Sequence, residues 1–94
     1  MMSETGQRIL VVDDETSIRR YLRAALSAQG FTVYEAVNGQ EALNAVIASR
    51  PDIIILDLGL PDIDGIEVTR RLREWSQTPI IILSVREAEQ DKID

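Results

Sequence analysis

The segment Ile53–Gly65, with the sequence IIILDLGLPDIDG, decides the fold of this chain. Four consecutive apolar residues lead directly into Asp57, and the eight residues that follow contain two glycines, one proline and two further acids. A short apolar run bounded by turn residues is typical of a parallel strand that is covered on both faces. The sequence therefore predicts a buried strand that delivers the carboxylate of Asp57 into a loop.

Two other apolar runs share this pattern of a short strand that ends at polar residues. Ile9–Val12 ends at Asp13 and Asp14, and Ile80–Leu83 ends at Ser84. Because each run is too short for a buried helix, we expect two more strands of the same sheet. Both of them end at a residue with a side chain that can take part in chemistry.

Between the apolar runs, the spacing of apolar residues is helical. The segment 31–36 interrupts this spacing, and its β-branched and aromatic residues predict one more strand. Asn38 followed by Glu41 resembles a capping box and predicts the start of a second helix, while Asp64 and Gly65 predict the start of a third. Strands that alternate with helices indicate the α/β class, with a doubly wound parallel sheet. The first helix is expected to bury one face, formed by Ile18, Tyr21, Leu22, Ala25 and Leu26.

Three acids are candidates for a shared site at one edge of this sheet. In open α/β sheets, ligands bind beyond the carboxyl ends of the strands, at the point where the winding reverses. If the first and third strands are neighbours there, Asp13, Asp14 and Asp57 converge. Two carboxylates about 5 Å apart repel by roughly 3 kcal/mol at an effective dielectric constant near 20, so such a cluster favours a cation. Oxygen ligands alone favour Mg²⁺, which also binds phosphate oxygens.

A phosphoryl group that arrives at this edge could react with Asp57, because carboxylates are known to form aspartyl-phosphates. Ser84 could donate its hydroxyl to a phosphate oxygen. The backbone of Leu58 and Gly59 could contribute too, since glycine lets the main chain approach closely.

Each of these residues also has a purely structural interpretation. Asp13 or Asp14 could cap the following helix, Asp57 could be an exposed loop acid, and Ser84 could be another helix cap. The basic residues of the first helix, Arg19, Arg20 and Arg23, are expected to form a solvated face, although they could meet an acidic partner.

The composition restricts the chemistry to carboxylates, and a soluble, cytoplasmic protein is expected. The chain has 94 residues, a net charge of −6, no histidine and no cysteine. Direct nucleic-acid binding is not expected from so acidic a chain, because phosphate binding needs clustered bases. No apolar run approaches the roughly 20 residues of a membrane span.

Taken together, three motifs in this order and spacing resemble the receiver domain of two-component response regulators. They are ILVVDDE, LDLGLPDIDG and PIIILS, and the resemblance spans about residues 8 to 94. Within the family, the sequence is most similar to the winged-helix (OmpR/PhoB) class, and in particular to the regulators of potassium-uptake operons.

This resemblance implies a flavodoxin-like sheet with the strand order 2-1-3-4 and a role in signal transduction. It implies that Asp57 accepts a phosphoryl group from a sensor histidine kinase. It also implies that Asp13, Asp14, Asp57 and the main-chain carbonyl of Gly59 hold Mg²⁺, and that Ser84 is the switch residue that turns toward the phosphate. The protein would then be part of a transcriptional response regulator and not an enzyme acting on outside substrates.

The sequence departs from the family pattern at its C-terminal end. In the family, a fifth strand follows, with an aromatic switch residue and a lysine that pairs with the phosphoryl group, and Lys92 does not match that lysine. We therefore expect residues 1–94 to form one receiver domain that is incomplete at its C-terminus and has no output domain. Self-association through the exposed edge of Ile80–Leu83 is a further expectation.

Two other functional classes remain open at this stage. One is a protein-interaction module that no longer takes up phosphate, because the matching lysine is missing. The other is a Mg²⁺-dependent phosphohydrolase that forms an aspartyl-phosphate, of the haloacid dehalogenase kind. Such enzymes place a second acid two residues after the nucleophile, where this chain has Gly59, and this argues against them.

Overall fold

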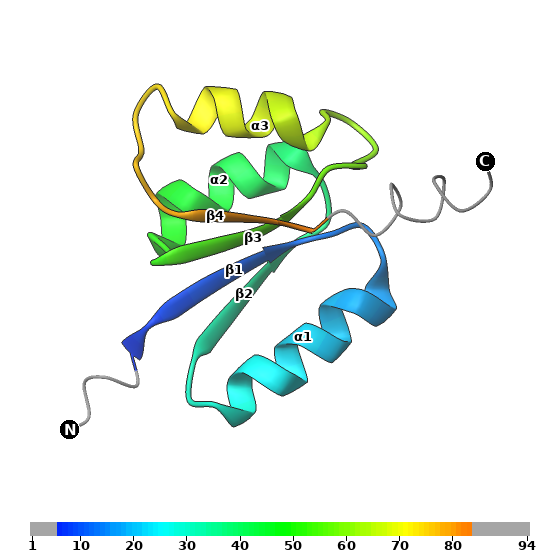
Figure 1. Ribbon diagram of the computed structural model, residues 1–94, viewed down its shortest axis with the longest axis vertical. Coiled ribbons are helices and arrows are strands. Elements are labelled where there is room, and N and C mark those ends of the chain that lie inside the picture. The colour runs from blue at the N-terminus through cyan, green and yellow to red at the C-terminus, as the bar shows by residue number, and fades with distance from the viewer. Residues whose placement is uncertain (1–5, 84–94) are drawn as a thin grey trace.

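The computed structural model describes residues 6–83, which fold into a parallel sheet with helices on both of its faces (Figure 1). Figure 1 shows α1 on one face of the sheet and both α2 and α3 on the other. The elements follow one another as β1 (Arg8–Val12), α1 (Thr16–Ala28), β2 (Thr32–Ala36), α2 (Gly39–Ser49), β3 (Ile53–Asp57), α3 (Gly65–Leu72) and β4 (Ile80–Leu83).

The order of the strands confirms the expected doubly wound topology. All neighbouring strands pair in parallel, in the order β2-β1-β3-β4, so β1 and β3 lie side by side. In their register Val12 pairs with Leu56, which places the next residues, Asp13 and Asp57, at the same edge of the sheet. The winding reverses at β1, and this edge is therefore the one where a ligand is expected.

Side chains that alternate along the strands form a separate apolar cluster on each face of the sheet. Beneath α1, the buried residues are Ile9, Val11 and Val33. The larger cluster lies beneath α2 and α3, and burying each of its larger side chains contributes about 1.5–3 kcal/mol to folding. Its central members are Leu10, Val12, Ile54, Leu56, Val68 and Leu72.

Local polar contacts start two of the helices, as the sequence predicts. The side chain of Asn38 accepts a hydrogen bond from the Glu41 amide at 2.8 Å, and the Glu41 carboxylate accepts one from the Val37 amide at 3.1 Å. Asp64 caps α3 in the same way, through the Glu67 amide at 2.9 Å. These contacts satisfy amide groups that have no partner within the helix.

The buried face of α1 is narrower than the sequence predicts. Leu22 and Leu26 pack against the cluster beneath this helix, whereas Tyr21 is 71% exposed and Ala25 is also exposed. The prediction for Tyr21 and Ala25 is therefore wrong. α1 makes its main strand contacts with β1 and β2, and Leu22 and Leu26, four residues apart, are the residues of this face that pack against the cluster.

The strand β4 lies at one margin of the sheet as described, where β3 is its neighbour. Its residues Ile81 and Ile82 are 54% and 44% exposed. Self-association through this edge stays a prediction.

Ser84 and Lys92 lie outside the described residues. Within residues 6–83, no helix is long and apolar enough to cross a membrane.

Candidate functional site

Three carboxylates from two neighbouring strand ends form an acidic cluster at the carboxyl edge of the sheet. Asp57 is the last residue of β3, and Asp13 and Asp14 directly follow β1. One carboxylate oxygen from each residue lies within 4.8 Å of the other two. Asp13 is 2% exposed and Asp57 is 5% exposed, whereas Asp14 is exposed to solvent. Asp57 is thus not an exposed loop acid, and we call these three residues the acidic cluster.

The backbone around Asp13 explains how its carboxylate comes to be buried. The Asp13 amide donates to the carbonyl of Ala36 at 3.1 Å and so continues the β1–β2 pairing by one residue. Its own Oδ1 then accepts a hydrogen bond from the Glu15 amide at 2.9 Å, which turns the chain toward α1. Glu15 is the N-cap residue of α1, and the helix has no side-chain cap. The N-cap position belongs to Glu15, so neither Asp13 nor Asp14 is the N-cap residue of α1.

The electrostatics of the cluster favour a positive charge. Burial raises the pKa of the Asp13 carboxyl, and the negative charges of Asp57 and Asp14 raise it further. The hydrogen bond from the Glu15 amide acts in the opposite direction and lowers this pKa. A cation among the three carboxylates would relieve a repulsion of roughly 3 kcal/mol per close pair.

The loop that follows Asp57 is folded tightly against the start of α3. The Gly65 amide donates to the carbonyl of Leu58 at 2.9 Å. A β-carbon on Gly65 would lie 2.8 Å from the carbonyl oxygen of Asp57 and 2.8 Å from the α-carbon of Leu58. Only glycine allows this approach, because real β-carbons do not come so close to backbone atoms. The main chain just after Asp57 is therefore held in one place.

Asp62 has a positioning role that the sequence analysis missed. This exposed residue of the β3–α3 loop accepts hydrogen bonds from the amides of Gly39 and Gln40 at 2.7 and 3.0 Å. The bond from Gly39 is the main reason why the pKa of Asp62 is lowered. The loop is thereby tied to the N-terminus of α2. Asp62 in the sequence is a loop acid like many others, and nothing near it identifies the helix that it reaches.

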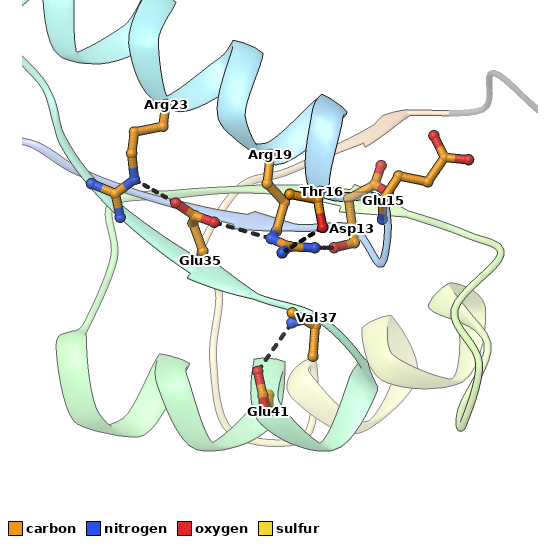
Figure 2. Close-up of polar contacts among 8 residues, drawn as sticks. All are labelled: Asp13, Glu15, Thr16, Arg19, Arg23, Glu35, Val37 and Glu41. Atoms are coloured by element: carbon orange, nitrogen blue, oxygen red, sulfur yellow. Dashed lines mark hydrogen bonds and ion pairs between the residues drawn. The ribbon is translucent and has the colours of Figure 1, made fainter.

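Arg19 is largely covered and does not lie on the solvated face that the sequence suggested. Figure 2 shows the guanidinium groups of Arg19 and Arg23 directed at Glu35 of β2. Arg19 also donates to the main-chain carbonyl of Asp13 at 2.9 Å. These contacts lower the pKa of Glu35, with Arg23 making the larger contribution. The expectation of an exposed position holds for Arg20 and for Arg23, whose side chain is 49% exposed.

Two of the expected site residues are placed less completely. Gly59 is exposed and lies two residues after Asp57. Ser84 lies outside the residues that the structure describes, so its predicted role stays a prediction.

A separate cavity of about 350 Å³ lies at the C-terminal end of α2, and the acidic cluster takes no part in it. The cluster is therefore a site at the sheet edge and not the lining of this cavity, which is formed by Val46, Ile47, Arg50, Pro51, Trp75, Ser76 and Thr78.

A doubly wound parallel sheet with an acidic cluster at the carboxyl ends of its central strands defines the class of flavodoxin-like receiver domains. The chain belongs to the response regulator receiver domain family, which it matches over residues 9–94.

Curated relatives in this family are regulators of transcription. The chain is 54% identical over 85 residues to the KDP operon transcriptional regulatory protein KdpE of Escherichia coli strain K12, a match that covers 90% of this chain and 38% of that protein. It is 45% identical over 89 residues to the transcriptional regulatory protein SrrA of Staphylococcus aureus, which covers 95% of this chain and 37% of that protein. The chain thus spans well under half of the length of these relatives.

Solved structures of response regulators show the same fold. The response regulator TrrA of Thermotoga maritima, solved in complex with Mg²⁺-BeF, is 40% identical with a TM-score of 0.78, over 83% of this chain and 69% of that one. The receiver domain of a Francisella response regulator is 32% identical with a TM-score of 0.81, over 93% of this chain and 73% of that one.

Proposed function

We propose that this receiver domain accepts a phosphoryl group on Asp57 from a sensor histidine kinase. The observation that carries the proposal is the position of Asp57, which ends β3 inside a cluster of three carboxylates with oxygens within 4.8 Å of one another. A carboxylate in this position can act as a nucleophile, as carboxylates do in proteins that form aspartyl-phosphates.

The acidic cluster fits Mg²⁺. Its ligand atoms are all oxygens, two of its three carboxylates are buried, and their mutual repulsion is relieved by a cation. We propose that Asp13, Asp14 and Asp57 hold the ion together with the main-chain carbonyl of Gly59. When bound, Mg²⁺ neutralises the charge on the phosphoryl oxygens.

In the proposed reaction Asp57 is the nucleophile, and the residues around it hold the backbone and contact the phosphate. An oxygen of Asp57 attacks the phosphorus of a phosphohistidine, the phosphorus–nitrogen bond breaks, and its electron pair returns to the imidazole of the kinase. Asp57 becomes an acyl phosphate. The tight approach of Gly65 holds Leu58 against the start of α3, so the backbone beside the acceptor does not have to reorganise. Leu58 and Ser84 are proposed to contact the phosphate and to respond to it.

The wider role follows from the relatives and is also a proposal. A module of this kind transmits a signal in the cytoplasm and does not turn over outside substrates. As part of a longer protein similar to KdpE, it would control transcription. We propose potassium as its signal on the sequence resemblance to regulators of potassium-uptake operons.

Incubation with acetyl phosphate and Mg²⁺, followed by intact-mass spectrometry, tests the central step. We expect the wild-type chain to gain the mass of one phosphoryl group, and Asp57→Asn to gain none. Asp52→Asn is the matched control, because Asp52 is an exposed acid at the opposite end of β3, and it should gain the same mass as the wild type.

Other outcomes of this experiment identify the competing functions. A folded wild-type chain that gains no mass would refute phosphoryl transfer and favour a protein-interaction module. Steady release of phosphate from unrelated phosphate esters would favour a phosphohydrolase.

A further inference from the structure

The guanidinium group of Arg19 joins three separate segments next to the acidic cluster. Its Nε donates to Oε1 of Glu35 on β2 at 3.0 Å, and its Nη1 donates to the main-chain carbonyl of Asp13 at 2.9 Å. A longer contact of 3.5 Å joins its Nη2 to the hydroxyl of Thr16 at the start of α1. Figure 2 shows Arg19 between Glu35 and the Asp13 carbonyl. Only 14% of its side chain is exposed, so water competes little for these contacts.

The atom that Arg19 contacts on Asp13 belongs to the backbone, and the carboxylate of the same residue belongs to the cluster. Asp13 is also held through its amide, by the carbonyl of Ala36, and through Oδ1, by the amide of Glu15. With the bond from Arg19, both main-chain polar groups of Asp13 are fixed. The direction of its carboxylate is then set by the surrounding structure before any ligand arrives.

We propose that Arg19 is a positioning residue that holds the β1–α1 loop so that Asp13 and Asp14 present their oxygens to a divalent cation. This inference rests on the proposed function, in which the acidic cluster binds Mg²⁺. Glu35 has a supporting part, because it fixes the guanidinium from the β2 side.

The sign of the effect separates positioning from electrostatics. A positive charge beside a cation site repels the cation, so by charge alone the removal of Arg19 would tighten Mg²⁺ binding. By positioning, the same removal would free the Asp13 carbonyl and weaken binding. Residues that hydrogen-bond to the metal ligands, without contacting the metal, typically raise metal affinity by about 10–100-fold, and this gain is lost when they are removed.

Calorimetric titration with Mg²⁺ measures this sign directly. For Arg19→Ala we expect binding to be about ten-fold weaker than in the wild type, the lower limit of that range. Arg23→Ala is the matched control, because it removes a partner of the same Glu35 and leaves the bond from Arg19 to Asp13 in place; its affinity should stay close to that of the wild type. In Arg19→Lys the charge is kept, but one ammonium group cannot reproduce the planar fork, and binding should stay weakened.

Amide hydrogen exchange adds a measurement that needs no metal. In Arg19→Ala the amide of Glu15, which donates to Asp13, should exchange faster, and by a larger factor than the amide of Leu10 in the middle of β1, which reports the change in overall stability. Equal acceleration at Leu10 would show a general loss of stability and overturn the proposal.

The two experiments also separate this inference from the proposed function. Mg²⁺ binding in Arg19→Ala that equals or exceeds that of the wild type would overturn the positioning role. If the wild type bound no Mg²⁺, the metal part of the proposed function would fail, and exchange at Glu15 would still decide whether Arg19 holds the loop. Unchanged exchange there would overturn the inference in either case.

Discussion

The backbone of Gly65 lies so close to the backbone of Asp57 and Leu58 that a side chain at position 65 would not fit. The hydrogen bond from its amide to the carbonyl of Leu58 requires this approach. One missing β-carbon thus allows the loop after the proposed phosphoryl acceptor to close onto α3.

Replacement of this glycine should disturb both stability and site. Because the added β-carbon of Gly65→Ala would meet backbone atoms at 2.8 Å, we expect the free energy of unfolding to fall by about 1–3 kcal/mol. Urea denaturation followed by circular dichroism measures the change. Gly6→Ala is the control, since a β-carbon there meets nothing within 4 Å. Equal stability of the two variants would show that the loop can relax at no cost.

Individual site residues could be predicted where the sequence pattern itself ends at them. Asp13 and Asp57 each follow an unbroken apolar run, and parallel strands bring such ends to one edge. Arg19 could not be predicted in this way, because its partners Glu35 and Asp13 belong to other segments and no local spacing connects them. Arg19 reaches these partners only because the tertiary fold brings their segments together.

Two ion pairs join α1 to the strand β2. Glu35 of β2 accepts from both Arg19 and Arg23 of α1, and these contacts lower its pKa below the ordinary value of 4.5. A group with a lowered pKa in the folded state stabilises the fold above its ordinary pKa. That stabilisation is lost as the pH falls through the lowered value, because the carboxylate is then protonated in the folded protein too.

This linkage predicts how acid affects the packing of α1. We expect the wild type to exceed Glu35→Gln in unfolding free energy by at most about 1 kcal/mol near neutral pH, because Glu35 is partly exposed. The difference should be constant above a pH of about 4.5 and should shrink below it. Thermal unfolding from pH 7 to pH 3 measures it. Glu74→Gln, which removes an exposed acid of the segment after α3, serves as the control; a difference that grows toward low pH would contradict the assignment.

The helices show which local patterns can be trusted. The starts of α2 and α3 were predictable, because a capping side chain and its amide are only three residues apart. The buried face of α1 was not, because Tyr21 has the right spacing for burial but Leu22 and Leu26 are the residues that pack against the cluster beneath this helix. Amphipathic spacing predicts a helix, and the tertiary arrangement decides how much of the apolar stripe is covered.

At the scale of the whole molecule, the strand order of the sheet determines where the acidic cluster forms and which strands are the most protected. The alternation of strands and helices was enough to predict its class, while the order β2-β1-β3-β4 depended on resemblance to a known family. Any two apolar strands of similar length can pair in principle, so composition and periodicity do not distinguish one strand order from another. The convergence of the acidic cluster depends on this order.

The central strands should be the last part of the molecule to open. β1 is paired on both sides and Leu10 is fully buried, whereas β2 has β1 as its neighbour at the margin of the sheet. We expect amide exchange in β1 and β3 to require nearly the full free energy of unfolding, and exchange at the free side of β2 to require less. Exchange monitored by nuclear magnetic resonance measures this order. Protection in β2 as strong as in β1 would contradict it.

The central place of β1 also affects how the chain can fold while it is being made. Of the four strands that the structure describes, β1 leaves the ribosome first, yet its pairing of Ile9 with Ile53 needs a segment that is synthesised much later. Until then β1 has one partner at most, and an apolar strand edge stays open to other chains. β1 is expected to be the best protected strand of the finished domain, yet during synthesis one of its edges stays unpaired until β3 has been made.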